Sequence, residues 1–451
     1  MESTVQVKES SFVAPSEATP TKALWLSPLD LLQASNGHTL MVYLYRADAD
    51  GAAFFDMTRL KEALAKALVA FYPLAGRLGV DEDGRIEISC NSEGALFTVA
   101  ASDHTADDFD FKPSTELGRI FVPRIKPSSI ILAIQVTLLK CGSVVLGTAF
   151  HHAAGDGLSA FHFLQTWAAL SRNAAAAAVE VEQLPCHDRD LLRPRSPPVV
   201  HPDALSVLFP EVAFSKPSGP TAAAAFTISK DQVAALRRRC GGGGRGASST
   251  FSAVSALVWR CACAARRLAP GTRVRLVFPA EVRRKLRPAL PDRYFGNAIV
   301  RLGVARRVAA SAVSEDCSSA AMALASVAGR IACAIAKVDD ELVRSGIDYL
   351  NLAEATELRV SGWVGRGGGM AETDLRITSW LGMPVNDVDF GWGEPQIMSR
   401  AESICAGSVY LMEDAGEGGR GAVRMLVGLE AANMDRFKRL FHAGIAEESE
   451  L

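Results

Sequence analysis

The chain has 451 residues, of which 49% are hydrophobic and 22% are charged, and its formal net charge is −2. This length exceeds what one ordinary hydrophobic core needs, so the sequence predicts two domains in a soluble globular protein. The small net charge gives no reason to expect a nucleic acid or an anionic membrane as a partner. No apolar stretch approaches the roughly 20 residues that span a bilayer, so we expect no membrane insertion.

The N-terminus and the cysteines indicate the compartment. Residues 1–8 lack the apolar stretch of a signal peptide, so export is not expected. Nine cysteines are scattered along the chain without a Cys-x-x-Cys pair. An odd number without zinc-ligand spacing favours reduced, mostly buried thiols, and we therefore expect a cytoplasmic protein.

The predicted N-terminal domain, residues 1–184, mixes strands with helices. A strand is predicted over 42–45, followed by an amphipathic helix over 59–71 that ends at Tyr72-Pro73. Two further strands are predicted over 131–139 and 143–150, joined at Cys141-Gly142. Eight prolines then crowd residues 185–221, where they make regular structure improbable and favour an extended crossover between domains.

The predicted C-terminal domain, residues 222–451, opens with helices over 231–239 and 250–267. Between them lies a glycine-rich run, 241–246, which lacks the Gly-Lys-Ser/Thr ending of a phosphate-binding loop. We therefore interpret the run as a flexible surface loop.

The most informative stretch is His151-His152-Ala153-Ala154-Gly155-Asp156-Gly157, which lies between the strand over 143–150 and a helix from Leu158 onward. An imidazole at a strand end is well placed to meet a substrate, and it can take and return a proton near neutral pH. Successive strand side chains point to opposite faces, so only one of His151 and His152 can enter a given crevice. The stretch predicts an enzyme.

Two other chemistries compete for this stretch. His152 and Asp156 could bind a metal, but no third ligand stands at suitable spacing, so no metal is expected. Residues 157–161 begin like the nucleophile elbow of a serine hydrolase, yet the closing glycine is missing. The remaining six histidines are assigned structural roles: His38, His104, His162, His187, His201 and His442.

Asp156 could form a catalytic dyad with His152. It also stands just before the helix that Leu158 starts, where a carboxylate can accept exposed backbone N–H groups and complement the helix dipole. We favour this structural role, in which Asp156 holds the loop that presents His152.

Several ordered motifs together resemble one family. They are the His-x-x-x-Asp-Gly stretch, Tyr72-Pro73-Leu74-Ala75-Gly76-Arg77-Leu78, Tyr294-Phe295-Gly296-Asn297, Thr378-Ser379-Trp380 and Asp389-Phe390-Gly391-Trp392-Gly393. This set, which spans almost the whole chain, resembles the BAHD family of plant acyl-CoA-dependent acyltransferases, and in particular its hydroxycinnamoyl-CoA branch.

The resemblance implies an α/β fold of two similar-sized, chloramphenicol-acetyltransferase-like domains with mixed sheets, joined by a long crossover. It also implies that His152 deprotonates a hydroxyl or amine acceptor as this attacks the thioester of acyl-CoA, with no acyl-enzyme. Acyl-CoA is then a co-substrate, no cofactor is required, and the protein is expected to be a monomer.

The resemblance also assigns roles to individual residues. Thr378 and Trp380 match positions at the reaction centre, where they could stabilise an oxyanion. Asp389, Gly391 and Gly393 belong to a structural motif, and Asp389 is expected to pair with Arg283, although Glu281-Val282 departs from the family's usual Asp-Gly. Candidates to bind the CoA phosphates are Ser248, Ser249, Thr250, Arg284 and Lys285.

The acceptor is predicted from two local features. Thr39, Met41 and Tyr43 match an acceptor-lining strand, and Met41 suits a hydrocarbon or aromatic acceptor better than a polyol. Arg366 lies near, but not clearly in register with, an arginine that holds the shikimate carboxylate, while Glu372 and Asp374 favour a cationic amine. We therefore expect N-acylation of an amine such as putrescine, agmatine, tyramine or tryptamine. The alternatives are O-acylation of shikimate or quinate, and a non-catalytic acyl-CoA-binding protein.

Overall fold

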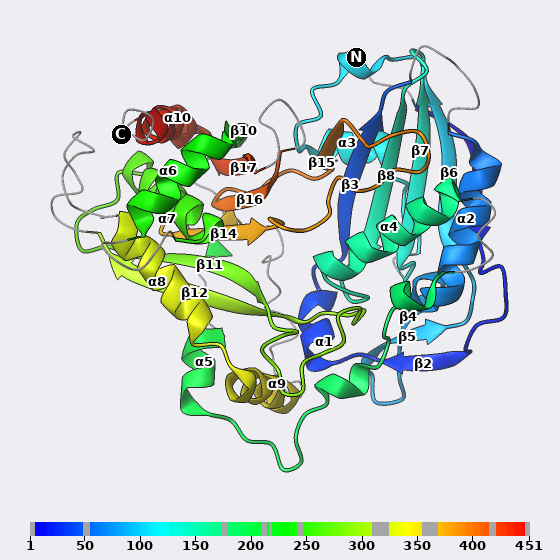
Figure 1. The fold of residues 1–451 in the computed structure, drawn as a ribbon, viewed down its shortest axis with the longest axis horizontal. Helices are drawn as coiled ribbons and strands as arrows, with labels where there is room; N and C mark the ends of the chain where they lie inside the picture. The colour runs from blue at the N-terminus through cyan, green and yellow to red at the C-terminus, as the bar shows by residue number, and fades with distance from the viewer. Residues whose placement is uncertain are drawn as a thin grey trace.

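The computed structural model describes residues 5–47, 55–127, 129–173, 179–208, 214–215, 219–241, 248–308, 324–353, 369–414 and 421–446. It contains two α/β units, each built on a six-stranded mixed sheet, and the two units stand next to each other in Figure 1. The predicted fold class is therefore confirmed.

The sheet of the first unit combines strands from both halves of the chain. In spatial order it contains β1 (Val5–Val13), β6 (Ala95–Ser102), β7 (Leu132–Leu139), β8 (Val144–His151), β3 (His38–Tyr45) and β15 (Ile397–Arg400). The pairs are antiparallel except for β6 and β7. Since β15 comes from the predicted C-terminal domain, a boundary at residue 222 does not separate two spatially closed units.

Helices cover both faces of the first sheet. On one face, α2 (Met57–Ala70) packs against α4 (Gly157–Arg172), while α3 (Thr115–Phe121) contacts β3, β7 and β8 from the other face (Figure 1). A small sheet of β2 (Lys22–Trp25), β5 (Ile86–Cys90) and β4 (Arg77–Val80) and the short helix α1 (Pro28–Ala34) complete this unit. Short 3₁₀ helices span Tyr72–Ala75 and Ala106–Asp108.

The sheet of the second unit has the order β10 (Thr221–Ile228), β17 (Val423–Glu430), β16 (Ser408–Glu413), β14 (Asp374–Ser379), β11 (Arg273–Glu281) and β12 (Ile299–Arg307). Its central strand β14 runs parallel to both neighbours. The helices of this unit are α6 (Lys230–Cys240), α7 (Thr250–Ala265), α8 (Leu324–Ala336), α9 (Asp340–Ala353) and α10 (Ala431–Ala446). Residues 242–247, most of the glycine-rich run, lie outside the described residues.

The crossover contains more regular structure than its prolines predict. It includes the 3₁₀ helix Arg189–Leu192, the helix α5 (Pro202–Leu208) and the short strand β9 (Phe214–Ser215), which pairs with β13 (Gly369–Met370), and a further 3₁₀ helix, Val181–Gln183, lies just before it. Pro202 is compatible with α5 because the N–H of the first helical residue has no intrahelical partner in any case. Arg195 holds the crossover to α9 through ion pairs with Glu341 and Asp348 at 2.8 and 2.7 Å.

The burial of the cysteines and the length of the helices bear on two of the predictions made from the sequence. The eight described cysteines are free, but only Cys90, Cys240 and Cys261 are buried, so the expectation of mostly buried thiols is wrong. Among the described helices, none combines the length and the apolar character that crossing a membrane requires.

Candidate active site

A cavity of about 360 Å³ lies between the two units. Its walls come from β3, the end of β8, the start of α4, β11, β14 and the region around β15. Six of the predicted site residues line it: Thr39, Met41, His152, Asp156, Thr378 and Trp380. In the described part of the chain, no group of three His, Cys, Asp or Glu side chains is placed to hold a metal ion.

The fully buried strand β8 delivers His152 to this cavity. His152 follows the last residue of the strand, and its backbone N–H donates to the carbonyl of Gly37 at 2.8 Å. His151 packs instead edge-on against His38, with ring centroids 4.8 Å apart, and its Nδ1 accepts the N–H of Ala153. Burial, with smaller contributions from His38 and His152, lowers the pKa of His151 to about 3. Of the two adjacent histidines, His152 is therefore the one that faces the cavity.

Asn297 determines which nitrogen of His152 carries the proton. The Asn297 Nδ2 donates to the carboxylate of Asp30 at 2.9 Å and to the His152 carbonyl at 2.8 Å. Its Oδ1 lies 3.2 Å from His152 Nδ1, and an amide oxygen can only accept. Nδ1 must therefore donate, which leaves the lone pair of the neutral imidazole on Nε2.

The protonation of His152 suits a group that accepts protons. Burial lowers the pKa of His152 below its ordinary value of 6.5, against opposing contributions from Asp156 and Asn297. A neutral imidazole therefore predominates at neutral pH. With Nε2 unprotonated, this side chain can take a proton from a nucleophile bound in the cavity.

Asp156 holds the loop that carries His152. Its carboxylate accepts the backbone N–H of Ser159 at 3.1 Å as the N-cap of α4, and that of Ala298 at 3.0 Å. Two further bonds of 2.9 Å come from the guanidinium of Arg283, which forms a buried ion pair across the two units. The predicted pairing of Arg283 with Asp389 is wrong, because the carboxylate that pairs with the Arg283 guanidinium is that of Asp156.

Thr378 and Trp380 face the same cavity from the second unit. Thr378 belongs to the central strand β14, Trp380 follows its last residue, and both residues line the wall. The indole lies edge-on to Phe161 of α4, with ring centroids 5.8 Å apart. Two residues whose side chains can donate hydrogen bonds thus line the cavity that His152 also lines.

Comparisons with known proteins decide the family. The model of the Transferase family matches residues 3–443. Putrescine hydroxycinnamoyltransferase 1 of Oryza sativa subsp. japonica is 44% identical, covering 97% of this chain and 98% of its own length. Shikimate O-hydroxycinnamoyltransferase of Nicotiana tabacum is 36% identical, covering 97% and 99%. The chain belongs to the BAHD acyltransferases.

Solved structures agree on the fold of this BAHD acyltransferase. Vinorine synthase is 22% identical with a TM-score of 0.70, covering 96% of each chain. The structure of F. graminearum TRI101 with coenzyme A and deoxynivalenol is 18% identical with a TM-score of 0.74, covering 93% of this chain and 97% of its own. As a member of its family, the protein is an acyl-CoA-dependent acyltransferase.

The motif at residues 389–393 of the acyltransferase lies away from the cavity. Asp389 Oδ1 accepts the N–H groups of Gly391 and Gly393 at 2.7 and 2.9 Å, and both glycines have positive φ, which favours residues without a Cβ. Asp389 lies 3.9 Å from Arg172 at the end of α4 rather than near Arg283. Phe390 packs edge-on to Trp167, with centroids 4.6 Å apart, so the motif fastens the loop after β14 to the first unit.

The predicted CoA-binding residues are not brought to the cavity wall. Ser249 is the N-cap of α7, with Ser248 before it and Thr250 as the first helical residue. Arg284 is 84% exposed on its side chain and lies 3.5 Å from Asp292. None of these residues, nor Lys285, lines the cavity, so their role in binding phosphates stays a prediction.

The acceptor prediction needs several corrections. Tyr43 is fully buried beside Met41 and does not line the cavity. Asp374 is buried in an ion pair with Arg275 at 2.9 Å, and Glu372 is not part of the wall either. Arg366 lies outside the described residues.

Other side chains that sequence reasoning missed do line the cavity. Among them are the titratable or charged side chains of His38, Glu281, Arg376, Arg400 and Glu402. Glu281 could have been noticed, because it stands two residues before Arg283 in a recognised motif. Glu402 gave no local signal, since it reaches the cavity only through the pairing of β15 with β3.

Replacing Asp156 by Asn should destabilise the enzyme, because it removes the buried carboxylate that accepts two hydrogen bonds from Arg283 and leaves only the more exposed Glu281, at 3.5 Å, as its counter-ion. Burial alone raises the pKa of Asp156, but Arg283 and the backbone N–H donors lower it overall, so the ionised form is bound in the folded state. We expect a loss of about 3–5 kcal/mol in the free energy of unfolding, measured by urea denaturation at pH 7.

The matched control is Asp190→Asn, which removes an ion pair with Arg193 whose side chains are 64% and 55% exposed. This change should cost less than about 0.5 kcal/mol. The pKa of Asp156 is lower in the folded than in the unfolded state. The stability that its ionised carboxylate contributes is therefore present above the unfolded-state pKa of about 3.9, and it is lost as the pH falls through the folded-state pKa. Equal effects of the two substitutions at pH 7 would contradict the assigned role.

Proposed function

We propose that this acyltransferase moves a hydroxycinnamoyl group from CoA to a primary amine of a small diamine such as putrescine. The observation that carries the proposal is one cavity that holds His152, with its Nε2 unprotonated, together with the partly exposed carboxylates of Glu281 and Glu402, which are paired with Arg283 and Arg400. The 44% identity to a putrescine hydroxycinnamoyltransferase supports both the donor and the acceptor.

The proposed reaction is a direct transfer. The neutral amine attacks the thioester carbonyl, and Nε2 of His152 takes the proton that the nitrogen loses. The tetrahedral intermediate carries an oxyanion, toward which the hydroxyl of Thr378 and the indole N–H of Trp380 can donate. Collapse of the intermediate breaks the C–S bond, and the departing thiolate takes from the imidazolium the proton that the amine lost. No acyl-enzyme forms.

The wall around β3 suits a diamine. Met41 contributes an apolar surface for methylene groups, and it pairs with Arg400 across β3 and β15. Glu402 lies beside it, because its Oε1 accepts the backbone N–H of Leu40 at 3.3 Å. We infer that the Glu402 carboxylate faces the distal ammonium while the methylene chain crosses Met41.

Acylation of a hydroxyl on shikimate or quinate is the second candidate. It is favoured by the guanidinium groups of Arg376 and Arg400 in the cavity, which could meet an acceptor carboxylate. Arg376 already donates to Ser408 Oγ at 3.0 Å. The ion pair between Arg400 and Glu402 occupies one candidate group for each acceptor and therefore favours neither. Among relatives, the shikimate enzyme is also less similar, at 36% against 44%. A cytoplasmic monomer stays a prediction.

Replacing His152 by Ala should remove the base. We expect the rate of CoA release from p-coumaroyl-CoA and putrescine to fall by about 10²–10⁴-fold, the usual contribution of a general base. The assay follows the free thiol, and His201→Ala, which changes an exposed histidine of the crossover, serves as the control. Full turnover by the His152 variant would overturn the proposed mechanism.

The pH dependence should separate an amine from a hydroxyl acceptor. Since the pKa of His152 is lowered, the base is already neutral at pH 7 and does not limit the rate above it. An ammonium cannot attack, so kcat/KM for putrescine should keep rising toward alkaline pH as the neutral amine becomes available. A hydroxyl acceptor predicts a plateau instead, and an optimum below pH 6 counts against N-acylation.

Replacing Glu402 by Gln should weaken binding of the amine. The side chain is 32% exposed and also serves Arg400, so we expect a modest loss of roughly 1 kcal/mol, seen as a rise in KM for putrescine of about fivefold. The KM for p-coumaroyl-CoA should stay within about twofold.

Glu372→Gln is the matched control for this change, because sequence reasoning selects that carboxylate but the structure does not place it in the cavity wall. It should leave both constants unaltered. A larger effect from Glu372 than from Glu402 would show that the acceptor binds elsewhere.

A further inference from the structure

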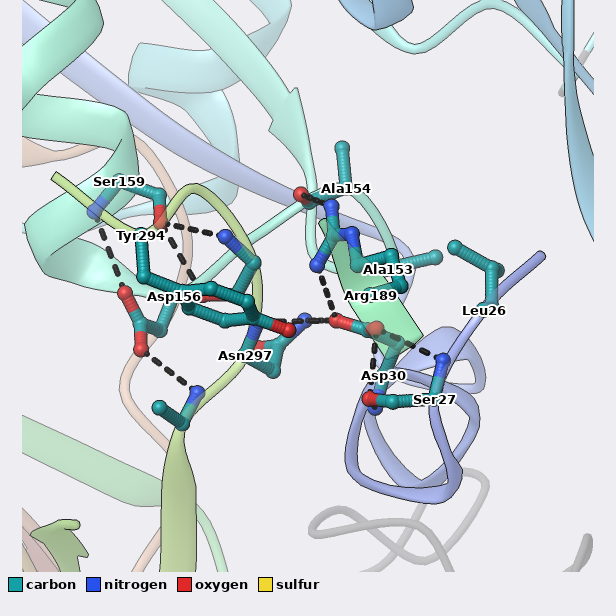
Figure 2. A network of polar contacts seen from close by, with 12 residues as sticks. Leu26, Ser27, Asp30, Ala153, Ala154, Asp156, Ser159, Arg189, Tyr294 and Asn297 are labelled. Carbon is teal, nitrogen blue, oxygen red and sulfur yellow. Dashed lines mark hydrogen bonds and ion pairs between the residues drawn. The ribbon is translucent and has the colours of Figure 1, made fainter. Parts of the chain in front are cut away.

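A buried polar network stands behind His152 and reaches Asp30 of α1. Asp30 and Arg189 have 0% and 2% of their surface exposed, and they form an ion pair at 2.9 Å. Figure 2 shows this pair joined to Asn297, the residue that contacts the imidazole. Neither Asp30 nor Arg189 lines the cavity, so neither can touch a substrate there.

Both carboxylate oxygens of Asp30 accept hydrogen bonds from identified donors. Oδ1 accepts from Arg189 Nη1 at 2.9 Å, from the backbone N–H of Asn297 at 2.8 Å and from its Nδ2 at 2.9 Å. Oδ2 accepts from the backbone N–H and the hydroxyl of Ser27, at 2.9 and 2.7 Å, in the capping box of α1. The carboxylate is thus saturated with donors and held rigidly.

This saturation controls the orientation of the Asn297 amide. If the amide were turned over, its oxygen would face the Asp30 carboxylate and the His152 carbonyl, both of which only accept hydrogen bonds. A buried contact between acceptors costs far more than it gains. The oxygen is therefore kept on the side of His152 Nδ1.

We propose that Asp30 is a positioning residue that holds His152, through Asn297, in the tautomer with Nδ1 protonated and Nε2 available. The inference rests on the proposed role of His152 as the base. A rotated Asn297 would present its NH₂ group to Nδ1, which would favour the other tautomer, with the proton on Nε2 and no lone pair toward the acceptor.

Arg189 links the polar network behind His152 to the contact between the two units. Its Nη2 donates to the carbonyl of Ala154, two residues after His152, at 2.8 Å. The guanidinium passes so close to Gly296 that a Cβ there would lie 1.6 Å from Nη1, so only glycine fits beside it. Asp30 belongs to the first unit, Arg189 to the crossover and Asn297 to the second unit, so the tautomer depends on how these three segments meet.

The test replaces Asp30 by Asn in the full-length enzyme. The neutral amide can no longer act as an acceptor on both atoms, so Asn297 can turn. We expect kcat to fall by about 10–100-fold, the range seen when a residue that orients a metal-binding histidine is removed, with both KM values within about threefold. The acid limb of kcat/KM should also move to lower pH, because Asn297 Oδ1 favours the protonated imidazole.

Nitrogen NMR reads the tautomer independently of activity. The chain has only 8 histidines, so long-range proton–nitrogen spectra of protein labelled with ¹⁵N-histidine can be assigned with the His152→Ala variant. The wild type should show the proton on Nδ1, and Asp30→Asn should show a substantial share on Nε2. If Asp30→Asn fails to fold, Asn297→Ala replaces it as the test, because it keeps the Asp30–Arg189 pair. This variant should lower kcat and show a mixture of the two tautomers.

Asp348→Asn is the matched control. Asp348 is equally buried and pairs with a crossover arginine, Arg195, at 2.7 Å, but it lies outside the network around His152. It should reduce stability without changing kcat or the tautomer. A loss of kcat as large as that of Asp30→Asn, or an unchanged tautomer and kcat in Asp30→Asn, overturns the inference. Turnover by His152→Ala would instead overturn the proposed function, whatever Asp30→Asn does.

Discussion

The ion pair between Asp156 and Arg283 joins the two α/β units beside the loop that carries His152. Moving two charges out of water is costly, and the cost is offset here because the carboxylate accepts four hydrogen bonds, from Arg283, Ser159 and Ala298. Arg283 in turn donates to the carbonyls of Tyr294 and Gly296, in the segment that leads to Asn297. One buried pair therefore sets the start of α4, the position of the histidine loop and the segment that contacts its imidazole.

Polar contacts between the units orient individual atoms, whereas apolar contacts bury surface. Close to the cavity, directional hydrogen bonds through Asp30, Asn297 and Asp156 define the orientation of single atoms. Further away, Phe390 and Trp392 pack against Trp167 and Phe55 and bury apolar surface. Packing of this kind stabilises the interface without selecting a proton position, whereas a hydrogen bond selects both a distance and a donor.

The part of the wall that we propose to bind the acceptor lies outside the family motifs. Relatives that are 36–44% identical are named for putrescine, 5-hydroxyanthranilate and shikimate as acceptors. In this chain the wall beside β3 contains Met41 and Glu402, and the latter is brought there by β15. Under the proposed function, changes beside β15 could therefore alter the acceptor without disturbing the loop that carries His152.

The sequence by itself determined the local elements, the motif order that indicates the family, the histidine loop and the helix cap at Asp156. These features depend on periodicity, on strand alternation and on hydrogen bonds across three residues, all of which are encoded locally. Only the tertiary structure decided that Arg283 pairs with Asp156, 127 residues away, and that Asp30 meets Asn297 across 267 residues. It likewise placed Glu402, rather than Glu372, in the cavity wall. Such pairings arise from the packing of whole units, and no spacing along the chain records which distant donor and acceptor will share a buried site.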